Sequence, residues 1–321
     1  MTTKPNITIL DGDAANPGDL SWDALRQLGN VTIYPITSDE QKILRAKDAD
    51  IILTNKVLLD RPTLQQLPRL KYIGVQATGY NVVDLPAARE QGIIVTNVPA
   101  YSTDSVAQHT ISLLLAATNQ VQHYAHATRQ GIWAAKPAFC YWDTNLIELA
   151  SKTFAIIGFG NIGRKVASIA HALGMNVIAQ TSKPQQQLPE YVTKVTRDEL
   201  LSQADVISIH CPLTDATLHT VDVQTIRQMK PTAIVINTGR GPLVDEVAMA
   251  QALHEGRLAA YCADVMEQEP PSAHNPLLRE PTAFLTPHIA WATREARQRL
   301  LNVVTNNVRA FLDGHPQNVV S

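Results

Sequence analysis

Short apolar runs alternate with amphipathic stretches along most of the 321-residue chain. Runs such as 51–53, 206–210 and 233–237 are followed by polar residues, Gly or Pro, which is typical of buried strands. Between the runs, apolar residues recur at the three- and four-residue spacing of helices. Regular alternation of strand and helix predicts parallel sheets covered by helices, and therefore an α/β fold.

The first hundred residues follow this pattern without a glycine-rich loop. Ser21 is predicted to cap a helix that carries Trp22, Leu25 and Leu28 and is closed by Gly29-Asn30. A second helix begins at Ser38, which forms a capping-box pattern with Gln41. We therefore expect an α/β domain of its own here. Its predicted strands are 7–10, 31–36, 51–53, 70–75 and 93–96.

The stretch 154–163, Phe-Ala-Ile-Ile-Gly-Phe-Gly-Asn-Ile-Gly, has the pattern of a strand that turns into a helix. Gly158 suits a tight turn, Gly160 leaves room for a phosphate, and Gly163 lets the helix pack closely on the strand. The amphipathic run that ends at Gly174 and the apolar run after it complete a βαβ unit. A tight turn without a ligand has the same local pattern, but the complete unit favours dinucleotide binding at the helix start.

The last predicted helix, 293–312, is followed by no strand, so we expect the chain to return to its first domain. The predicted fold has two doubly wound parallel-sheet domains. Residues 1–99 and 289–321 would form a flavodoxin-like substrate domain, and residues 100–288 an inserted Rossmann nucleotide domain. A long apolar helix, 105–119, would lie between the two domains.

The bulk composition excludes several classes of protein. Net charge is −2 and charged residues make up 17% of the chain, without long runs of one sign, which argues against nucleic-acid and membrane partners. The three cysteines are widely spaced, so neither a disulfide framework nor a metal site is expected. Residues 1–5 lack the apolar core of a signal peptide. We therefore expect a cytoplasmic protein.

The stretch 131–145 is rich in aromatic residues and is expected to form a loop or an arm. Two interpretations stay open for these aromatic residues. They would either cover a subunit partner or pack on the chain's own surface. The residues concerned are Trp133, Phe139, Tyr141 and Trp142.

Three polar residues, Arg240, Glu269 and His288, each follow a predicted strand of the second domain. Together they suit hydride transfer between a nicotinamide and a 2-hydroxy acid. A guanidinium can clamp a carboxylate, a histidine can move a proton near neutral pH, and a carboxylate can orient that histidine. Taken singly, they also fit a surface ion pair, a solvated loop carboxylate and a structural histidine.

Several motifs resemble those of the D-isomer-specific 2-hydroxyacid dehydrogenases. They are Asn-Thr-Gly-Arg-Gly at 237–241, Asp264-Val265 with Glu-Pro-Pro at 269–271, and Thr-Pro-His-Ile-Ala at 286–290, in order after the glycine loop. The resemblance covers nearly the whole chain. It is closest to the glycerate dehydrogenase (hydroxypyruvate reductase) branch, through the stretches 10–22, 53–56, 77–81 and 101–109.

This resemblance implies roles for individual residues. His288 would be the acid/base, Glu269 its partner and Arg240 the substrate clamp. Asn55 and the backbone amides of Ala77, Thr78 and Gly79 would bind the substrate. The implied cofactor-binding residues are Gly158, Gly160, Asn161, Ile162, Gly163, Thr181, Ser182, Lys183, Cys211, Pro212, Thr238, Gly239, Asp264 and Ala290.

Alternatives remain for two of these cofactor residues. Asp264 would contact the nicotinamide amide, but it also suits a turn cap. Cys211 also fits the role of a small residue that packs in the core.

The resemblance also implies a homodimer that packs through the nucleotide domain.

The activity implied is an exchange of hydride between NAD(P)H and a small 2-oxo acid, converting hydroxypyruvate or glyoxylate to D-glycerate or glycolate. D-lactate, branched-chain 2-hydroxy acids and 3-phosphoglycerate are alternative substrates. A non-catalytic, dinucleotide-sensing protein of the corepressor type is the alternative from another class.

The end of the second strand of the βαβ unit indicates which cofactor is used. NAD-using members of the family usually carry an Asp here that binds the adenosine ribose, and this chain has Thr181, followed by Ser182 and Lys183. Hydroxyl donors and a positive charge suit a 2′-phosphate, which an Asp would repel. The sequence therefore favours NADP, although Lys183 also suits a solvated loop.

Overall fold

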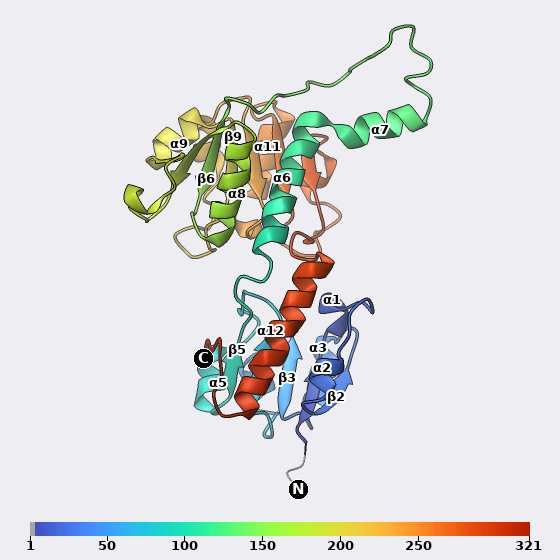
Figure 1. Ribbon diagram of the computed structural model, residues 1–321, viewed down its shortest axis with the longest axis vertical. Coiled ribbons are helices and arrows are strands. Elements are labelled where there is room, and N and C mark those ends of the chain that lie inside the picture. The colour runs from blue at the N-terminus through green and yellow to red at the C-terminus, as the bar shows by residue number, and fades with distance from the viewer. Residues whose placement is uncertain (1–3) are drawn as a thin grey trace. The chain divides into compact units, whose positions relative to one another are not determined.

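The computed structural model describes residues 4–321, so the first three residues of the segment used for the signal-peptide prediction lie outside it. The chain divides into two compact units (Figure 1). Unit 1 consists of Met1–Ser102 and Ala292–Ser321, and unit 2 of Thr103–Trp291. The C-terminal segment belongs to unit 1, so unit 2 is inserted between two parts of it.

Unit 1 contains a five-stranded sheet in the order β2-β1-β3-β4-β5, with every pair of strands parallel. This is the flavodoxin-like order, as predicted. Two of the three inner strands, β3 and β4, are buried along their whole length because helices cover both faces of the sheet. The strands are β1 (Asn6–Ile9), β2 (Asn30–Ile33), β3 (Ile51–Thr54), β4 (Tyr72–Val75) and β5 (Ile94–Thr96).

The helices of unit 1 include five short ones and one long C-terminal helix. The predicted capping box of Ser38 and Gln41 is present at the start of α3. The prediction at Ser21 is wrong in its extent. Helix α2 is a single turn that starts after Trp22, and the Ser21 hydroxyl only accepts a bond from the Asp23 amide. The helices are α1 (Gly12–Ala15), α2 (Asp23–Arg26), α3 (Asp39–Ala46), α4 (Arg61–Leu64), α5 (Leu85–Glu90) and α12 (Arg294–Leu312).

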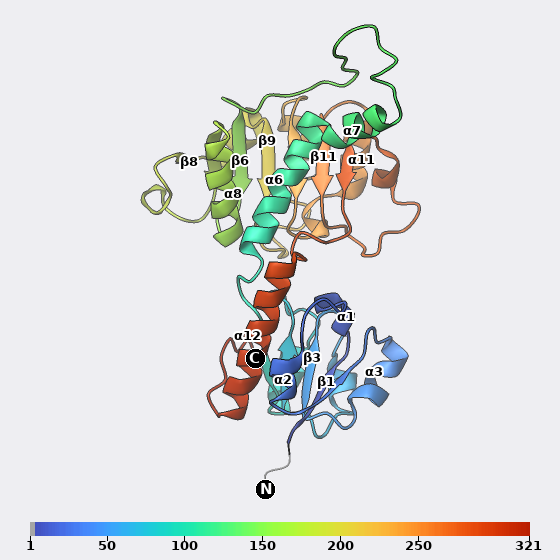
Figure 2. The same ribbon diagram turned by 45° about the vertical axis from the view of Figure 1, so that its right-hand side comes forward.

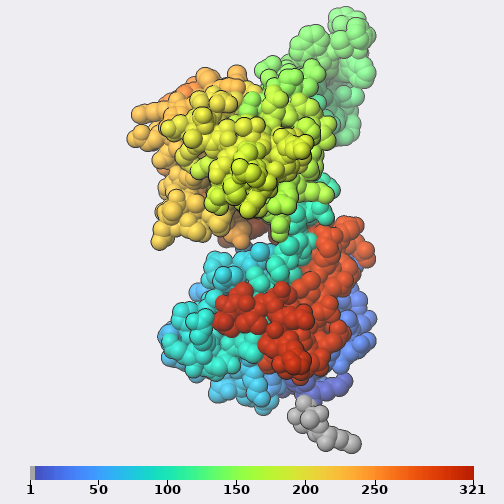
Figure 3. All heavy atoms as spheres, turned by 60° about the vertical axis from the view of Figure 1, so that its left-hand side comes forward, coloured from blue at the N-terminus to red at the C-terminus, as the bar shows by residue number. Residues whose placement is uncertain are grey.

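The C-terminal segment is an integral part of unit 1. The ring of Phe311 on α12 lies 4.7 Å, centroid to centroid, from that of Tyr72 on the inner strand β4. Arg297 on the same helix forms two hydrogen bonds with the carboxylate of Asp19, of 2.6 and 2.7 Å. Figure 3 shows these C-terminal residues, in red, lying over the blue and cyan residues of unit 1.

Unit 2 contains a seven-stranded parallel sheet in the order β12-β11-β10-β9-β6-β7-β8. This is the Rossmann order extended by one strand, and the order of strands reverses between β6 and β9. The strands are β6 (Thr153–Ile157), β7 (Asn176–Gln180), β8 (Val192–Lys194), β9 (Val206–Ile209), β10 (Ile234–Asn237), β11 (Ala260–Ala263) and β12 (Ala283–Leu285).

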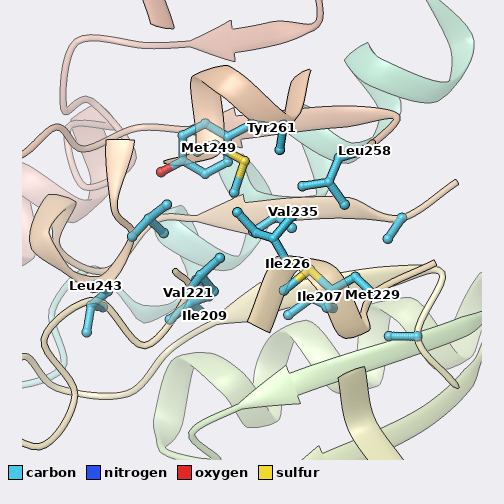
Figure 4. Packing of buried hydrophobic residues seen from close by; sticks show 14 of the residues in the cluster. Ile207, Ile209, Val221, Ile226, Met229, Val235, Leu243, Met249, Leu258 and Tyr261 are labelled. Carbon is cyan, nitrogen blue, oxygen red and sulfur yellow. The ribbon is translucent and has the colours of Figure 1, made fainter. Parts of the chain in front are cut away.

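Helices cover both faces of this sheet (Figure 2). Alternate residues of each strand point to opposite faces, so that Phe154 and Ile156 join the cluster beneath α6 and α8, whereas Ala155 and Ile157 join the opposite cluster. Figure 4 shows the second cluster, which packs against α10 and α11. The helices are α6 (Thr103–Asn119), α7 (Val121–Arg129), α8 (Asn161–Ala172), α9 (Arg197–Gln203), α10 (Val223–Gln228) and α11 (Glu246–His254), with 3-10 turns η1 (Gln185–Gln187), η2 (Gly241–Leu243) and η3 (Pro276–Arg279).

The aromatic stretch forms an arm, which we define as residues 121–146. It begins with α7 and continues as an irregular loop that projects from the sheet of unit 2 (Figure 1). Within it, Tyr141 contacts the ring of Tyr124 on α7. Phe139 and Trp142 are 89% and 70% exposed. The arm thus packs part of its aromatic surface on itself and presents the rest to solvent.

Across residues 4–321, no helix combines the length and the apolarity needed to cross a membrane.

Candidate active site

Two of the three glycines in the turn between β6 and α8 are required by packing. Gly158 has a φ of +94°, and a Cβ there would lie 2.5 Å from the amide nitrogen of Cys211. A Cβ on Gly163 would lie 2.3 Å from the carbonyl oxygen of Gly158. At Gly160, by contrast, a Cβ would meet no heavy atom within 4 Å. The lack of a side chain at Gly160 therefore leaves its backbone open to a ligand.

The first turn of α8 provides hydrogen-bond donors beside Gly160. This residue is the N-cap of the helix and makes no side-chain capping bond. Within the part of the chain that the structure describes, the amides of Asn161, Ile162 and Gly163 have no protein acceptor. Free amides at the positive end of a twelve-residue helix suit an anionic group such as a pyrophosphate.

A pocket of about 950 Å³ opens beside this turn, at the carboxyl ends of β6, β7 and β9. This is where the order of strands reverses, and ligands bind open α/β sheets at such points. Half of the predicted cofactor residues line it: Gly158, Gly160, Thr181, Ser182, Lys183, Cys211 and Pro212. The others do not line this pocket: Asn161, Ile162, Gly163, Thr238, Gly239, Asp264 and Ala290.

Two of the pocket residues that were not predicted from the sequence, Arg197 and Gln180, offer polar groups to a ligand. Arg197, the first residue of α9, lines the pocket and donates hydrogen bonds to the hydroxyl and the carbonyl of Thr220. The side-chain oxygen of Gln180, at the end of β7, is buried and accepts no hydrogen bond from any described residue. An orphaned acceptor and a fixed guanidinium in the wall of a pocket both fit a polar ligand.

His210 and Cys211 line the pocket without carrying charge. Burial lowers the pKa of His210 to about 4, and its Nε2 lies 2.8 Å from the Ser208 hydroxyl. Burial also raises the pKa of the Cys211 thiol above its usual value. A protonated thiol is a poor nucleophile, which agrees with the alternative that Cys211 is a small packing residue.

Two of the three predicted catalytic residues, Glu269 and His288, are in contact, on the loops after β11 and β12. His288 Nδ1 lies 2.7 Å from Glu269 Oε2, and Glu269 Oε1 accepts a bond of 3.2 Å from the amide of Met266. His288 has a φ of +54°, a strained value for a residue with a side chain. Strain of this kind persists only where the surrounding structure holds it, and it is common at functional sites.

Arg240 lies on the neighbouring loop and is exposed. Asn237 braces this loop, since its side chain donates to the Arg240 carbonyl at 2.9 Å and accepts from the Gly239 amide at 3.0 Å. The guanidinium donates to the Gly239 carbonyl at 2.7 Å. Over residues 4–321 it has no carboxylate partner, so the alternative of a surface ion pair finds no support.

Asp264 is 1% exposed and holds the loop that carries His288. Its carboxylate accepts hydrogen bonds from the amides of Ile289 and Ala290, at 2.8 and 2.7 Å, and from the Thr286 hydroxyl at 2.6 Å. Burial alone would raise the pKa of Asp264, but hydrogen bonds from His109, Thr286 and the two amides outweigh it and lower the pKa. Asp264 therefore caps a turn, as the alternative interpretation held.

Two supporting residues of this cluster lie on α6. The His109 ring nitrogen Nε2 lies 2.9 Å from the Thr286 hydroxyl, and the hydroxyls of Thr110 and Thr238 are 2.9 Å apart. His109 was noted only as part of a family-like stretch, because its partners lie far along the chain. The side chain of Thr238, a predicted cofactor residue, thus points toward α6.

Unit 1 carries its own polar cluster at the carboxyl edge of its sheet. The amides of Ala77, Thr78 and Gly79, just after β4, donate to no acceptor within residues 4–321. Asn55 contacts this loop through a 2.7 Å bond from its side chain to the Gln76 carbonyl. The carboxylate of Asp11 in turn accepts from the Asn55 amide at 2.8 Å. Successive free amides of this kind form a concave site for an anion.

Comparison with known proteins identifies the family. A family model described as "D-isomer specific 2-hydroxyacid dehydrogenase, NAD binding domain" matches residues 111–290, more than half of the chain. A hydroxypyruvate reductase of Blautia hydrogenotrophica is 44% identical over 319 residues, covering 98% of this chain and 99% of the relative. A glycerate dehydrogenase of Methylorubrum extorquens is 42% identical over 283 residues, covering 88% of each chain.

Solved structures agree with this comparison. The TT0316 protein of Thermus thermophilus superposes with a TM-score of 0.86 at 32% identity, covering 98% of this chain and 100% of that protein. An acyclic imino acid reductase (Bsp5), solved with NADPH and D-Arg, superposes with a TM-score of 0.84 at 28% identity, covering 98% and 100%.

The fold, the pocket and these comparisons agree: the chain belongs to the family of D-isomer-specific 2-hydroxyacid dehydrogenases. It is an oxidoreductase that uses a nicotinamide dinucleotide.

Proposed function

We propose that this enzyme reduces a small 2-oxo acid with NAD(P)H, with hydroxypyruvate and glyoxylate as the first candidates. The observation that carries the proposal is the 2.7 Å pair of His288 and Glu269. Arg240, which no carboxylate of residues 4–321 neutralises, lies on the loop after the neighbouring strand β10. The names of the relatives that match most of the chain, hydroxypyruvate reductase, glycerate dehydrogenase and glyoxylate reductase, support this choice of substrates.

In this proposal His288 moves the proton. Glu269 accepts a hydrogen bond at Nδ1, which leaves Nε2 to face the carbonyl oxygen of the substrate. When bound, NAD(P)H would supply the hydride for the carbonyl carbon, and Nε2 of His288 would deliver a proton to the oxygen, which together give a hydroxy acid. The Glu269 carboxylate stabilises the imidazolium before transfer, which makes His288 a stronger candidate for general acid.

Arg240 and the loop 77–79 would bind the substrate. A guanidinium with no carboxylate partner can donate paired hydrogen bonds to the substrate carboxylate and carbonyl. The free amides of Ala77, Thr78 and Gly79 would bind the carboxylate from unit 1, and Asn55 would hold their loop. The domain assignment follows, with unit 1 as the substrate domain and unit 2 as the nucleotide domain.

A spectrophotometric assay tests the proposal. The purified enzyme is supplied with NADPH or NADH and a panel of 2-oxo acids: hydroxypyruvate, glyoxylate, pyruvate, branched-chain 2-oxo acids and 3-phosphohydroxypyruvate. We expect the highest kcat/KM for hydroxypyruvate or glyoxylate. Absence of turnover with every acid, with the dinucleotide still bound, would instead favour the dinucleotide-sensing protein.

NADP is the cofactor that the pocket favours. Thr181, Ser182 and Lys183 line it together with Arg197, and two cations and two hydroxyls in one pocket suit a 2′-phosphate. The carboxylate in the lining, that of Asp222, already caps α10 by accepting from the Thr225 amide.

Replacing Thr181 with Asp is expected to move the preference toward NADH. The new carboxylate would repel the 2′-phosphate, lowering kcat/KM for NADPH by roughly 10-fold or more, and it would accept hydrogen bonds from the ribose of NADH. Steady-state kinetics with both cofactors measure the change. Thr232→Asp, an exposed position outside the pocket, is the matched control. A wild-type enzyme that strongly prefers NADH would contradict the proposal.

We also propose that the enzyme is a homodimer and that the arm covers the second subunit. Phe139 and Trp142 are too exposed to be part of the chain's own core. A cluster of exposed aromatic residues is typical of a subunit interface.

Disrupting the arm is expected to produce monomers. In the double variant Phe139→Asp with Trp142→Asp, light scattering after size exclusion should change from twice 35.2 kDa to 35.2 kDa. The control Leu44→Asp, at an exposed apolar residue of unit 1, should stay dimeric. A wild-type monomer would contradict the proposal.

A further inference from the structure

The loop after β4 has its peptide groups fixed through their carbonyls. In a trans peptide the C=O and the following N–H point in opposite directions, so a bond to one orients the other. The carbonyls of Gln76, Ala77 and Thr78 thereby orient the free amides of Ala77, Thr78 and Gly79. These carbonyls accept from Asn55 Nδ2 at 2.7 Å, the Val98 amide at 3.0 Å and Asn97 Nδ2 at 2.7 Å, respectively.

Asn97 is itself held by two other asparagines. Its amide donates to the Asn318 carbonyl at 3.1 Å, and its carbonyl accepts from Asn307 Nδ2 at 3.0 Å. Asn318 Nδ2 donates to Asn307 Oδ1 at 2.8 Å, which closes the set. We call Asn97, Asn307 and Asn318 the asparagine bracket.

The bracket joins the end of β5, helix α12 and the C-terminal tail. Asn307 is 2% exposed, and both ends of its side-chain amide are hydrogen-bonded. Asn318 has a φ of +54°, which asparagine tolerates better than most residues. Beyond it, the Val320 amide donates to the Val95 carbonyl at 2.9 Å, so the tail lies along the edge of the sheet. The end of the chain thus fixes Asn97.

We propose that Asn97, held by the bracket, is a positioning residue for the carboxylate of the substrate. This inference rests on the proposed function, in which the amides of Ala77, Thr78 and Gly79 bind that carboxylate. If Asn97 releases the Thr78 carbonyl, the Thr78–Gly79 peptide can rotate. The Gly79 donor is then lost, and the Thr78 carbonyl oxygen, which repels a carboxylate, can take its place.

The substitutions Asn97→Ala and Asn97→Asp test the inference in the full-length enzyme. For Asn97→Ala we expect the KM for the 2-oxo acid to rise roughly 3- to 12-fold, the effect of one oriented hydrogen bond. The KM should rise further for Asn97→Asp, whose oxygen faces the Thr78 carbonyl. The kcat and the Kd for NADPH, measured by fluorescence, should change less than about twofold, since the nucleotide pocket belongs to unit 2.

Asn307 of the bracket provides a second variant, and its neighbour Asn306 provides a matched control. Asn307→Ala should raise the KM in the same direction, because Asn97 then loses a support. Asn306→Ala on the same helix should leave the KM unchanged, since among residues 4–321 the Asn306 side chain bonds only to Arg309. An unchanged KM in a folded Asn97→Ala enzyme overturns the inference. If Asn97→Ala does not fold, an unchanged KM in Asn307→Ala overturns it.

Failure of the proposed function can be told apart from failure of the inference. If the wild-type enzyme reduces no 2-oxo acid, the proposed function fails. Calorimetric binding of oxalate, a non-reacting carboxylate, then decides the inference on its own. An affinity equal in wild type and Asn97→Ala overturns it, and a weaker affinity in the variant supports it.

Discussion

Replacing His288 with Asn is expected to lower kcat by about 10³-fold while the dinucleotide still binds. Asparagine is close in size to histidine and can keep a hydrogen bond to Glu269, but it cannot deliver a proton to the substrate oxygen. The loss should therefore appear in kcat with both cofactors. Stopped-flow measurement of a single turnover would show that the chemical step, rather than product release, has slowed.

Glu269→Gln separates the role of the carboxylate from that of the ring. The amide can still accept a hydrogen bond from Nδ1, so the ring keeps its orientation, but the negative charge that favours imidazolium is gone. We expect a loss of kcat of roughly 10²-fold, smaller than for His288→Asn.

A histidine elsewhere in unit 2 supplies the control. The His254 side chain is 81% exposed and pairs only with Glu280, so His254→Asn should keep wild-type activity. Near-full activity of a folded His288→Asn enzyme would show that another group moves the proton.

The fold was predictable because its strands are buried on both faces. Strands β3, β4, β9 and β10 lie inside their sheets and consist almost entirely of apolar residues, so they stand out in the sequence. Strand β8 was not predicted, since it lies at an edge, spans three residues and buries only Val192. Helix α7 was not predicted either, because it buries only Ala127.

Site residues were predictable where the residues next to them in the sequence indicate their role. The glycine turn and the polar residues at strand ends follow from the chemistry of adjacent residues, as at Gly158 and Gly163. Arg197 and Gln180 were missed because only the folded sheet brings them to one pocket. The asparagine bracket was missed for the same reason, since Asn97 and Asn307 lie more than two hundred residues apart.

Asp264→Asn is expected to cost about 2–4 kcal/mol of unfolding free energy, together with most of the activity. The carboxylate satisfies two amides and a hydroxyl in a site that is 1% exposed. An asparagine keeps one acceptor oxygen and turns an NH₂ group toward a remaining donor. The 286–290 turn would then shift, and His288, which this turn carries in a strained conformation, would lose its position.

The loss of unfolding free energy in Asp264→Asn depends on pH in a direction that the pKa of Asp264 fixes. Because the pKa of Asp264 is lower in the folded protein than its ordinary value of 3.8, its ionised form stabilises the fold. That contribution is present above about pH 4 and is lost as the pH falls through the folded pKa. The stability difference between wild type and Asp264→Asn should thus be constant from about pH 5 to 8 and shrink below pH 4.

Urea unfolding of both proteins across this range measures the difference, with Asp48→Asn, an exposed carboxylate of unit 1, as the control. A difference that stays constant down to pH 3 would mean that Asp264 acts through its shape and not its charge. Since the same carboxylate orients the His288 turn, kcat of the variant should fall at every pH at which wild type is folded. A variant that loses stability but keeps kcat would show that the position of the 286–290 turn does not control catalysis.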